Sequence, residues 1–352
     1  MVGGPHQSRR RKTAALLQPI AKTFRRTSLS RLEQAAVRPA TQSRYRQLGQ
    51  DFLSWALCHN VSWTTHEDLE AAAVEYMEDL YDDGQPAHLG SALLAALRHL
   101  HPGLSLPRAA RAVVGWGKLR PPRQRLPIPR AVAAAIAGWM VSTARYDMAI
   151  AIMLSFVAYL RPHECMTLQP RCLIAPTAAA GAQYAFWGLV LNDFEQQRPG
   201  KTGIFDESVL IDMDPWLYPI LQTLKTTRTA TEPLWSFRMP AFRTAWAEAI
   251  GQLRLQQLGP QPHGLRHGGA SDDLLTRRRR LDEVKARGRW ACDQSLRRYA
   301  KATRLQQELA KVPVGILHFG QAIEAQFEQV IMHHHATQTM LVPLPVVPGR
   351  RR

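Results

Sequence analysis

The sequence is that of a basic globular protein. Its 352 residues are enough for two domains, and a hydrophobic content of 45% excludes wholesale disorder. Lys and Arg number 45 against 28 Asp and Glu, a formal net charge of +17, so a polyanion is the leading candidate for a partner. Basic ribosomal and membrane-surface proteins share such a charge, so charge alone does not choose among these classes.

Hydropathy and cysteine spacing exclude two further classes. The longest apolar run, Met148–Leu160, is shorter than the ~20 residues that a membrane-spanning helix needs, so we expect no membrane partner. The four cysteines contain no C-x-x-C pair and no zinc spacing, so we expect reduced core thiols and no metal site. They are Cys58, Cys165, Cys172 and Cys292.

Residues 1–35 predict a basic, flexible arm, because they are rich in Arg and the first acidic residue is Glu33. An organelle transit peptide, a nuclear import signal and an arm lying on DNA all have this composition. The sequence leaves these three open. A nuclear or cytoplasmic protein is expected, associated with the nucleoid in a bacterium, and organelle targeting is not excluded.

Residues 36–118 predict a small all-helical domain. Apolar residues recur at three- and four-residue steps from Thr41 to His59, and T-H-E-D at Thr65 resembles a capping box. The predicted helices are Thr41–His59, Thr65–Tyr81, His88–Leu100 and Pro107–Val114. The second carries an acidic cluster that forms either a solvated outer face or a protomer contact. This cluster comprises Glu67, Asp68, Glu70, Glu75, Glu78 and Asp79.

A linker over residues 119–129 separates this domain from a second one, over residues 130–312. Prolines favour an extended chain in the linker, and Arg123 and Arg125 are among the residues that make it basic. The second domain opens with two alanine-rich, buried helices, predicted at Arg130–Val141 and Arg145–Leu160.

Three strands are predicted next, at Cys172–Ala175, Gln183–Leu191 and Ser208–Met213. The connection between the last two contains a G-K-T-G turn with Lys201. It lacks the upstream glycine of a phosphate-binding loop, so we expect no nucleotide cofactor. Two helices are predicted to follow, at Pro215–Lys225 and Pro240–Leu258.

Residues 313–352 predict one amphipathic helix, Ile316–Met332, and a proline-rich tail. The apolar face of the helix either docks on a neighbouring protomer or packs on its own domain, and the sequence leaves both open. The face comprises Ile316, Phe319, Ile323 and Phe327.

The stretch from His263 to Tyr299 carries the residue types that metal-free phosphodiester cleavage needs. His263 and Arg266 lie three apart and share one face if the segment is helical. A guanidinium matches the charged oxygens of a phosphoryl group in transit, and a tyrosine hydroxyl is a nucleophile. The indole N–H of Trp290 is a further donor. Each residue alone has an ordinary explanation, as core or exposed surface.

This stretch resembles the active-site box of the tyrosine recombinases, the phage-integrase family. The family's H-x-x-R motif corresponds to His263 and Arg266, its later His-or-Trp position to Trp290, and its nucleophile to Tyr299. The resemblance implies a mainly α protein. An all-α core-binding domain would be joined to an α+β catalytic domain that is mostly helical with a small antiparallel sheet.

The resemblance also assigns residues before His263. The family's first arginine, in an R-x-x-E context after an apolar helix, corresponds to Arg161, with Glu164 as a structural partner. Its hairpin lysine corresponds to Lys201, and Lys225 is the fallback. Arg161 and Arg266 would hold the phosphate oxygens.

By this resemblance, Tyr299 would form a 3′-phosphotyrosine, with His263 assisting proton transfer and Lys201 protonating the leaving oxygen. Neither a metal nor a nucleotide cofactor would be required, and four protomers would act on two double-stranded DNA sites. Divergent flanking sequence suits a eukaryotic mobile-element branch. Residues expected to contact DNA are Arg44, Arg123, Arg125, Arg277, Arg278, Arg279, Arg280 and Arg297.

Two other functions remain open at this point. A type IB topoisomerase would share the chemistry but relax supercoils without pairing two sites. A domesticated DNA-binding protein would keep the basic surface without cutting.

Overall fold

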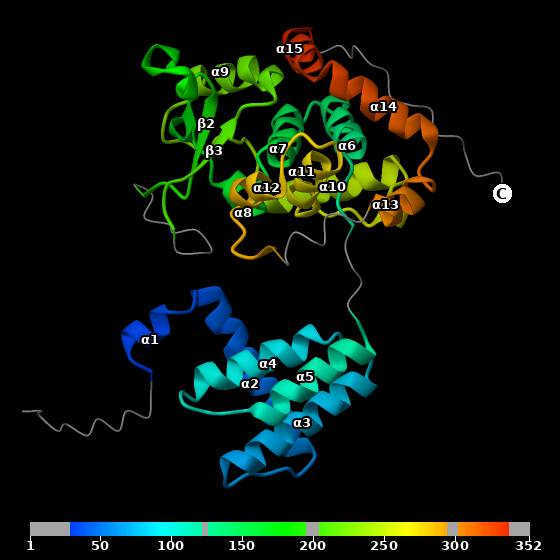
Figure 1. Cartoon of the computed structure of the whole chain (residues 1–352). Helices are drawn as coiled ribbons and strands as arrows, with labels where there is room; N and C mark the ends of the chain where they lie inside the picture. Colours follow the sequence, from blue (N-terminus) through cyan, green and yellow to red (C-terminus); the bar gives the residue numbers. More distant parts are fainter. Residues whose placement is uncertain (1–28, 122–125, 195–203, 294–301, 338–352) are drawn as a thin grey trace, which may run out of the picture. The chain divides into compact units, whose positions relative to one another are not determined.

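The computed structural model describes residues 29–121, 126–194, 204–293 and 302–337 (Figure 1). The chain divides into two compact units, Met1–Arg123 and Gln124–Arg352, and each is described below by itself. The described part is mostly helical with one small antiparallel sheet, and this coarse prediction of fold class is confirmed. In these residues no helix combines the length and apolar character that crossing a bilayer requires.

The N-terminal unit is built of helices around a core of aromatic and aliphatic side chains. Phe52 stacks on Trp63 with ring centroids 5.3 Å apart, and Leu93, Leu106 and Trp116 are buried beside them. The last helix is longer than predicted and ends at Leu119, where the linker was expected to begin. The helices are α1 (Arg31–Ala35), α2 (Pro39–Cys58), α3 (His66–Asp82), α4 (His88–Leu100) and α5 (Pro107–Leu119).

Helix α3 begins with the capping box that its sequence predicts. The Thr65 hydroxyl accepts the Asp68 N–H at 3.1 Å, and the Asp68 carboxylate accepts the Thr65 N–H at 3.0 Å. The solvated-face interpretation of the acidic cluster is wrong for Glu70, which is 7% exposed. Its carboxylate accepts the Ala109 N–H at 3.1 Å, a first-turn donor of α5 that lacks an intrahelical partner.

Helices α6 (Arg130–Ser142) and α7 (Tyr146–Val157) form the centre of the C-terminal unit and are buried along most of their length (Figure 1). Helix α14 (Val314–Ala325) packs closely on α6. A Cβ on Gly320 would overlap the Ala131 carbonyl, so the approach of the two backbones requires glycine at this position.

The C-terminal segment differs from its prediction. The expected single helix is two helices, α14 and α15 (Phe327–Thr337), separated at Gln326. The predicted apolar face is buried in the core of its own unit, with Ile316 1% and Ile323 0% exposed. Packing on its own domain is therefore the correct alternative.

The sheet has the order β1-β2-β3 and both pairings are antiparallel. Its strands are β1 (Leu173–Ile174), β2 (Trp187–Leu191) and β3 (Glu207–Ile211). The second strand was predicted to begin at Gln183, but a 3-10 turn at Ala182–Tyr184 precedes it. Val209 and Ile211 are buried as their alternation predicts, whereas Met213 lies beyond the strand and is 40% exposed.

Six further helices complete the described part of the C-terminal unit. The predicted helix to Leu258 ends at Gln252, and a 3-10 turn follows. These helices are α8 (Pro162–Met166), α9 (Tyr218–Thr226), α10 (Met239–Gln252), α11 (Gly264–Leu275), α12 (Leu281–Gly288) and α13 (Ala302–Leu309).

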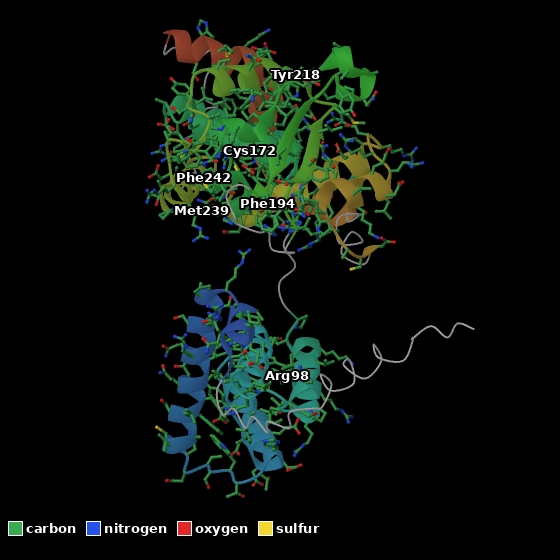
Figure 2. The ribbon with its side chains drawn as sticks, turned by 90° about the vertical axis from the view of Figure 1, so that its left-hand side faces the viewer. Arg98, Cys172, Phe194, Tyr218, Met239 and Phe242 are labelled. Atoms are coloured by element: carbon green, nitrogen blue, oxygen red, sulfur yellow. The ribbon has the colours of Figure 1, made fainter. Side chains whose placement is uncertain are left out.

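All four cysteines are free thiols, but only two of them are core residues. Cys165 and Cys172 are buried, and Figure 2 shows Cys172 inside the C-terminal unit. Cys58 and Cys292 are exposed, so the prediction of core thiols is wrong for them. Burial raises the pKa of the Cys165 thiol to about 12, which keeps it protonated at neutral pH.

Candidate functional site

Glu164 is the centre of a buried cluster of arginines in the C-terminal unit. Its side chain is 3% exposed, and its carboxylate accepts both the backbone N–H of Arg161, at 2.7 Å, and the Arg161 guanidinium. Arg289 donates to the same carboxylate at 2.6 Å, and the guanidinium of Arg266 lies 3.9 Å from it. One carboxylate thus contacts three guanidiniums, from the N-cap residue before α8, from α11 and from the turn after α12.

Arg266 is the most deeply buried of the three, with 2% of its side chain exposed. Its Nη1 donates to the Tyr159 carbonyl at 2.5 Å, and its Nη2 donates to the Gly288 carbonyl. The guanidinium carbon lies 4.6 Å from the centre of the Trp290 ring, a cation–π stack. Arg266 is therefore held by two carbonyls, an aromatic face and the nearby Glu164.

Glycines bring α11 and Trp290 close enough for this arrangement. A Cβ on Gly268 would overlap the Ile128 carbonyl, and one on Gly269 would overlap the Phe156 carbonyl at the end of α7. A Cβ on Gly288 would overlap the Trp290 ring. The H-G-L-R-H-G-G segment thus places Arg266 in the interior. A buried charge without a partner is costly, and the nearby Glu164 carboxylate offsets the cost of burying this guanidinium.

Arg287 and Arg289 connect the cluster to strand β3. Arg287 donates to the Leu210 carbonyl at 2.6 Å and to the Val157 carbonyl at 3.0 Å. Arg289 lies 3.6 Å from Glu207. Burial lowers the pKa of the Arg289 guanidinium, and the carboxylates of Glu164 and Glu207 oppose that shift.

Tyr159 contacts the cluster through its carbonyl, and the sequence analysis did not single it out because it lies within an apolar run. The residue is 1% exposed, and its hydroxyl donates to Asp273 at 2.5 Å. Burial, followed by the charge of Asp273, raises the pKa of the phenol, which stays protonated. Arg289 was also missed. Its position directly before Trp290 was the available signal.

The basic run Arg277–Arg280 divides into two pairs. Arg279 is 9% exposed and binds Asp212 and Asp273, the latter at 3.0 Å. Its expected phosphate contact stays a prediction. Arg278 lies 3.3 Å from Asp214. Arg277 and Arg280 are exposed, and Arg280 binds the neighbouring Asp282 at 2.7 Å. These outer two remain candidates for phosphate contacts, as does the exposed Arg44 on α2.

His263 directly precedes α11, one helical turn before Arg266. It is partly buried, and its ring meets the His267 ring edge to face with centroids 4.7 Å apart. Lys225, the alternative to Lys201 as the hairpin lysine, donates from its ammonium to the Leu173 carbonyl of β1 at 2.5 Å. Five predicted residues lie outside the described residues: Lys201, Tyr299, Arg297, Arg123 and Arg125.

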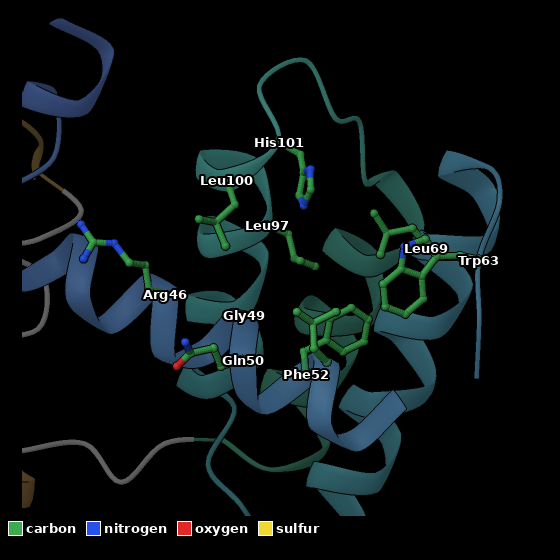
Figure 3. A pocket seen from close by; sticks show the side chains of 10 residues that line it. Arg46, Gly49, Gln50, Phe52, Trp63, Leu69, Leu97, Leu100 and His101 are labelled. Carbon is green, nitrogen blue, oxygen red and sulfur yellow. The ribbon is translucent and has the colours of Figure 1, made fainter. Parts of the chain in front are cut away.

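The N-terminal unit has a pocket between α2 and α4 (Figure 3). Its volume is about 240 Å³, and its lining is mainly apolar, with Phe52, Trp63 and Leu97 among its walls. Among the residues described, no group of three or more His, Cys, Asp or Glu side chains is arranged to hold a metal ion.

The arginine cluster combines cationic and anionic side chains in the interior of the unit. Three guanidiniums face two carboxylates, Glu164 and Glu207, and each guanidinium carries five N–H donors in a planar fork. Such forks match the oxygens of a phosphate or a carboxylate. Arg161, with 18% of its side chain exposed, is the most accessible of the three. The chain matches no protein-family model, and no curated protein sequence matches it.

Proposed function

We propose that this protein breaks and rejoins DNA strands in the manner of a tyrosine recombinase. The observation that carries the proposal is the cluster around Glu164. Arg161 and Arg266, 105 positions apart in the sequence, meet one carboxylate, and Trp290 stacks on Arg266. These are residues that the resemblance singles out in three separate segments, and the cluster supports a common role for them.

In the proposed reaction Tyr299 attacks the scissile phosphate, forming a phosphotyrosine on the 3′ end and freeing a 5′-hydroxyl. Arg161 and Arg266 stabilise the charge on the phosphate oxygens, and Glu164 orients both guanidiniums. His263 assists proton transfer near the nucleophile, and Lys201 protonates the leaving oxygen. The reverse attack by a 5′-hydroxyl rejoins the strand, so the step conserves bond energy and needs no nucleotide.

The proposed partner is double-stranded DNA, supported by the net charge of +17 and by the exposed Arg44, Arg277 and Arg280. A homotetramer on two DNA sites is part of the proposal. The tetramer rests on the resemblance alone. The apolar face of α14, which was the other argument for a protomer contact, is buried within its own unit.

One observation favours a second candidate, a DNA-binding protein that does not cut. Arg266 is 2% exposed, and its two terminal nitrogens donate to the backbone carbonyls of Tyr159 and Gly288. An arginine so placed also serves a purely structural purpose. The two candidates differ in whether a covalent protein–DNA adduct forms.

The experiment is covalent trapping with supercoiled and nicked plasmids that carry random inserts, because the target sequence is not specified by the site. The protein is incubated with DNA, quenched with detergent and assayed for protein-linked DNA. We expect an adduct from the wild type and none from Tyr299→Phe. Tyr184→Phe is the matched control, because Tyr184 is a 54% exposed tyrosine of the same unit and should leave the adduct intact.

Binding without an adduct across the whole insert library would reject the proposal in favour of the DNA-binding protein. An adduct accompanied by relaxation of a plasmid with a single site would indicate topoisomerase-like action. Exchange between two sites would indicate recombination.

A further inference from the structure

We infer that Tyr159 is a positioning residue that sets the placement of Arg266 and Arg289. For its effect on catalysis, this inference rests on the proposed function. The Tyr159 carbonyl accepts Arg266 Nη1 at 2.5 Å and Arg289 Nη2 at 3.3 Å. One backbone oxygen therefore contacts two of the three guanidiniums gathered at Glu164.

The conformation of Tyr159 directs that carbonyl. Helix α7 ends in a Schellman motif, in which the Leu160 N–H donates to the Ser155 carbonyl at 3.0 Å and Tyr159 has φ +49°. Glycine is the usual residue at such a position, because a side chain in the left-handed region is strained. Here a bulky aromatic residue occupies it.

Helix α12 also ends in a turn with a residue in the left-handed region. Arg289 has φ +54°, and the Trp290 N–H donates to the Lys285 carbonyl at 3.1 Å. Positive φ at residues other than glycine also occurs elsewhere in the described chain, for example at Ala144 and Arg254, so strain alone does not mark a site. Tyr159 and Arg289 differ from those examples because the two turns are bonded to each other.

The side chain of Tyr159 holds this turn in place. Its hydroxyl donates to Asp273 of α11 at 2.5 Å, and Arg279 binds the same carboxylate at 3.0 Å. The guanidinium of Arg287 lies 5.4 Å from the Tyr159 ring centre. Asp273 is seven residues after Arg266 on the same helix, so one tyrosine bonds α11 twice, through its carbonyl and through its hydroxyl.

A glycine would adopt the turn without strain but would lack the bond to Asp273. The tyrosine therefore strains the backbone, but its hydroxyl bond fixes the distance between the end of α7 and helix α11. Placement of the guanidinium within a fraction of an ångström is what phosphate chemistry requires of a donor, because small displacements reduce transition-state stabilisation.

The test removes only the hydroxyl, with Tyr159→Phe, in the full-length chain. The matched control is Tyr218→Phe. Tyr218 belongs to the same unit, is labelled in Figure 2, and donates from its hydroxyl to the Ile211 carbonyl at 2.8 Å, a different acceptor from Asp273. Asp273→Asn is the second variant, because it weakens the same bond from the acceptor side.

The first readout does not depend on activity. Phenylglyoxal modification of arginines is followed by mass spectrometry, with the exposed Arg243 as the internal reference. We expect Arg266 and Arg289 to be protected in the wild type and in Tyr218→Phe. In Tyr159→Phe and Asp273→Asn their modification should rise by roughly fivefold or more, since losing one buried hydrogen bond shifts a local equilibrium by about that factor. Unchanged protection in both variants would overturn the positioning role.

The second readout is the single-turnover rate of adduct formation at saturating DNA. Tyr159→Phe should lower this rate by about fivefold to thirtyfold while DNA affinity stays unchanged, and Tyr218→Phe should lower neither. An equal loss of rate in both variants would show a general structural effect and overturn the inference. If the wild type forms no adduct, the proposed function fails, and the arginine protection still decides the role of Tyr159.

Discussion

The two units bury charge in different ways. In residues 29–121 the core is aromatic and aliphatic, and Glu70 is the one charged residue buried there, bound to a backbone N–H. In the C-terminal unit, buried carboxylates such as Glu164 and Asp273 bind arginines that are themselves largely buried. A buried ion pair is weak evidence for stability, because desolvation offsets its attraction. Among the described residues, these buried ion pairs lie in the C-terminal unit, where the proposed function would use their fixed charge.

The difference also appears in how closely the helices approach. In the N-terminal unit the close contacts of helix glycines are with side chains, as at Gly90, where a Cβ would meet the Trp116 ring at 2.9 Å, and a Cβ on Gly115 of α5 would meet nothing within 4 Å. In the C-terminal unit a Cβ on Gly269 of α11 would overlap the backbone of α7. The close approach of α11 to the end of α7 also buries Arg266, which lies on the same helix.

The largest expected effect comes from neutralising the centre of the arginine cluster. Glu164→Gln leaves Arg161, Arg266 and Arg289 without their shared carboxylate, and breaking a buried pair in this way costs about 3–5 kcal/mol of unfolding free energy. Glu70→Gln is the matched change in the N-terminal unit. It keeps an oxygen to accept the Ala109 N–H and should cost less than about 1 kcal/mol.

Hydrogen exchange of peptides from each unit, measured in the full-length protein with increasing urea, separates the two effects. Equal losses in the two variants would mean that Glu164 is no more than another buried acceptor.

An intermediate effect is expected from the glycines. Gly269→Ala forces α11 away from the Phe156 carbonyl and should lower the unfolding free energy by about 1–3 kcal/mol. Gly115→Ala meets open space and should raise it by roughly 0.5–1 kcal/mol, since alanine restricts the unfolded chain and favours the helix. Thermal unfolding of the full-length variants checks the opposite signs, and a stabilising Gly269→Ala would contradict the close approach.

The smallest effect is a pH dependence confined to the C-terminal unit. Burial opposes ionisation of Asp212, but the hydrogen bond and charge of Arg279 outweigh it and hold the pKa of Asp212 below its ordinary value. A carboxyl with a depressed folded pKa contributes stability above its unfolded pKa, about 3.9, and loses that contribution as pH falls through the folded pKa.

Asp212→Asn should therefore destabilise the protein at pH 7, and the difference from the wild type should shrink as pH falls below about 4. Urea unfolding at a series of pH values measures this difference. Asp51→Asn, on the exposed face of α2, is the control and should leave the pH dependence unaltered. A difference that grows towards low pH would show that the ion pair with Arg279 is not the cause.

The sequence by itself determined most of the helices. The period of apolar residues and the caps predicted α3 with its capping box and α4 at its observed bounds. These features arise from interactions within a few residues, which a sequence displays directly. The alternation of Val209 and Ile211 likewise predicted a strand with one buried face. The predicted site residues remain predictions, and Lys201 and Tyr299 lie outside the described residues.

Only the tertiary structure decided where the charges go. The sequence could not show that Arg279 binds Asp212 and Asp273 instead of facing outward, or that Glu70 serves the first turn of α5. It also could not show that Tyr159, at the end of an apolar helix, holds Arg266 through its carbonyl. Each of these contacts joins residues that are distant in the chain, except for the bond between Arg279 and Asp273. Which residue pairs with a buried charge depends on which helices pack together, and the local sequence pattern does not show that packing.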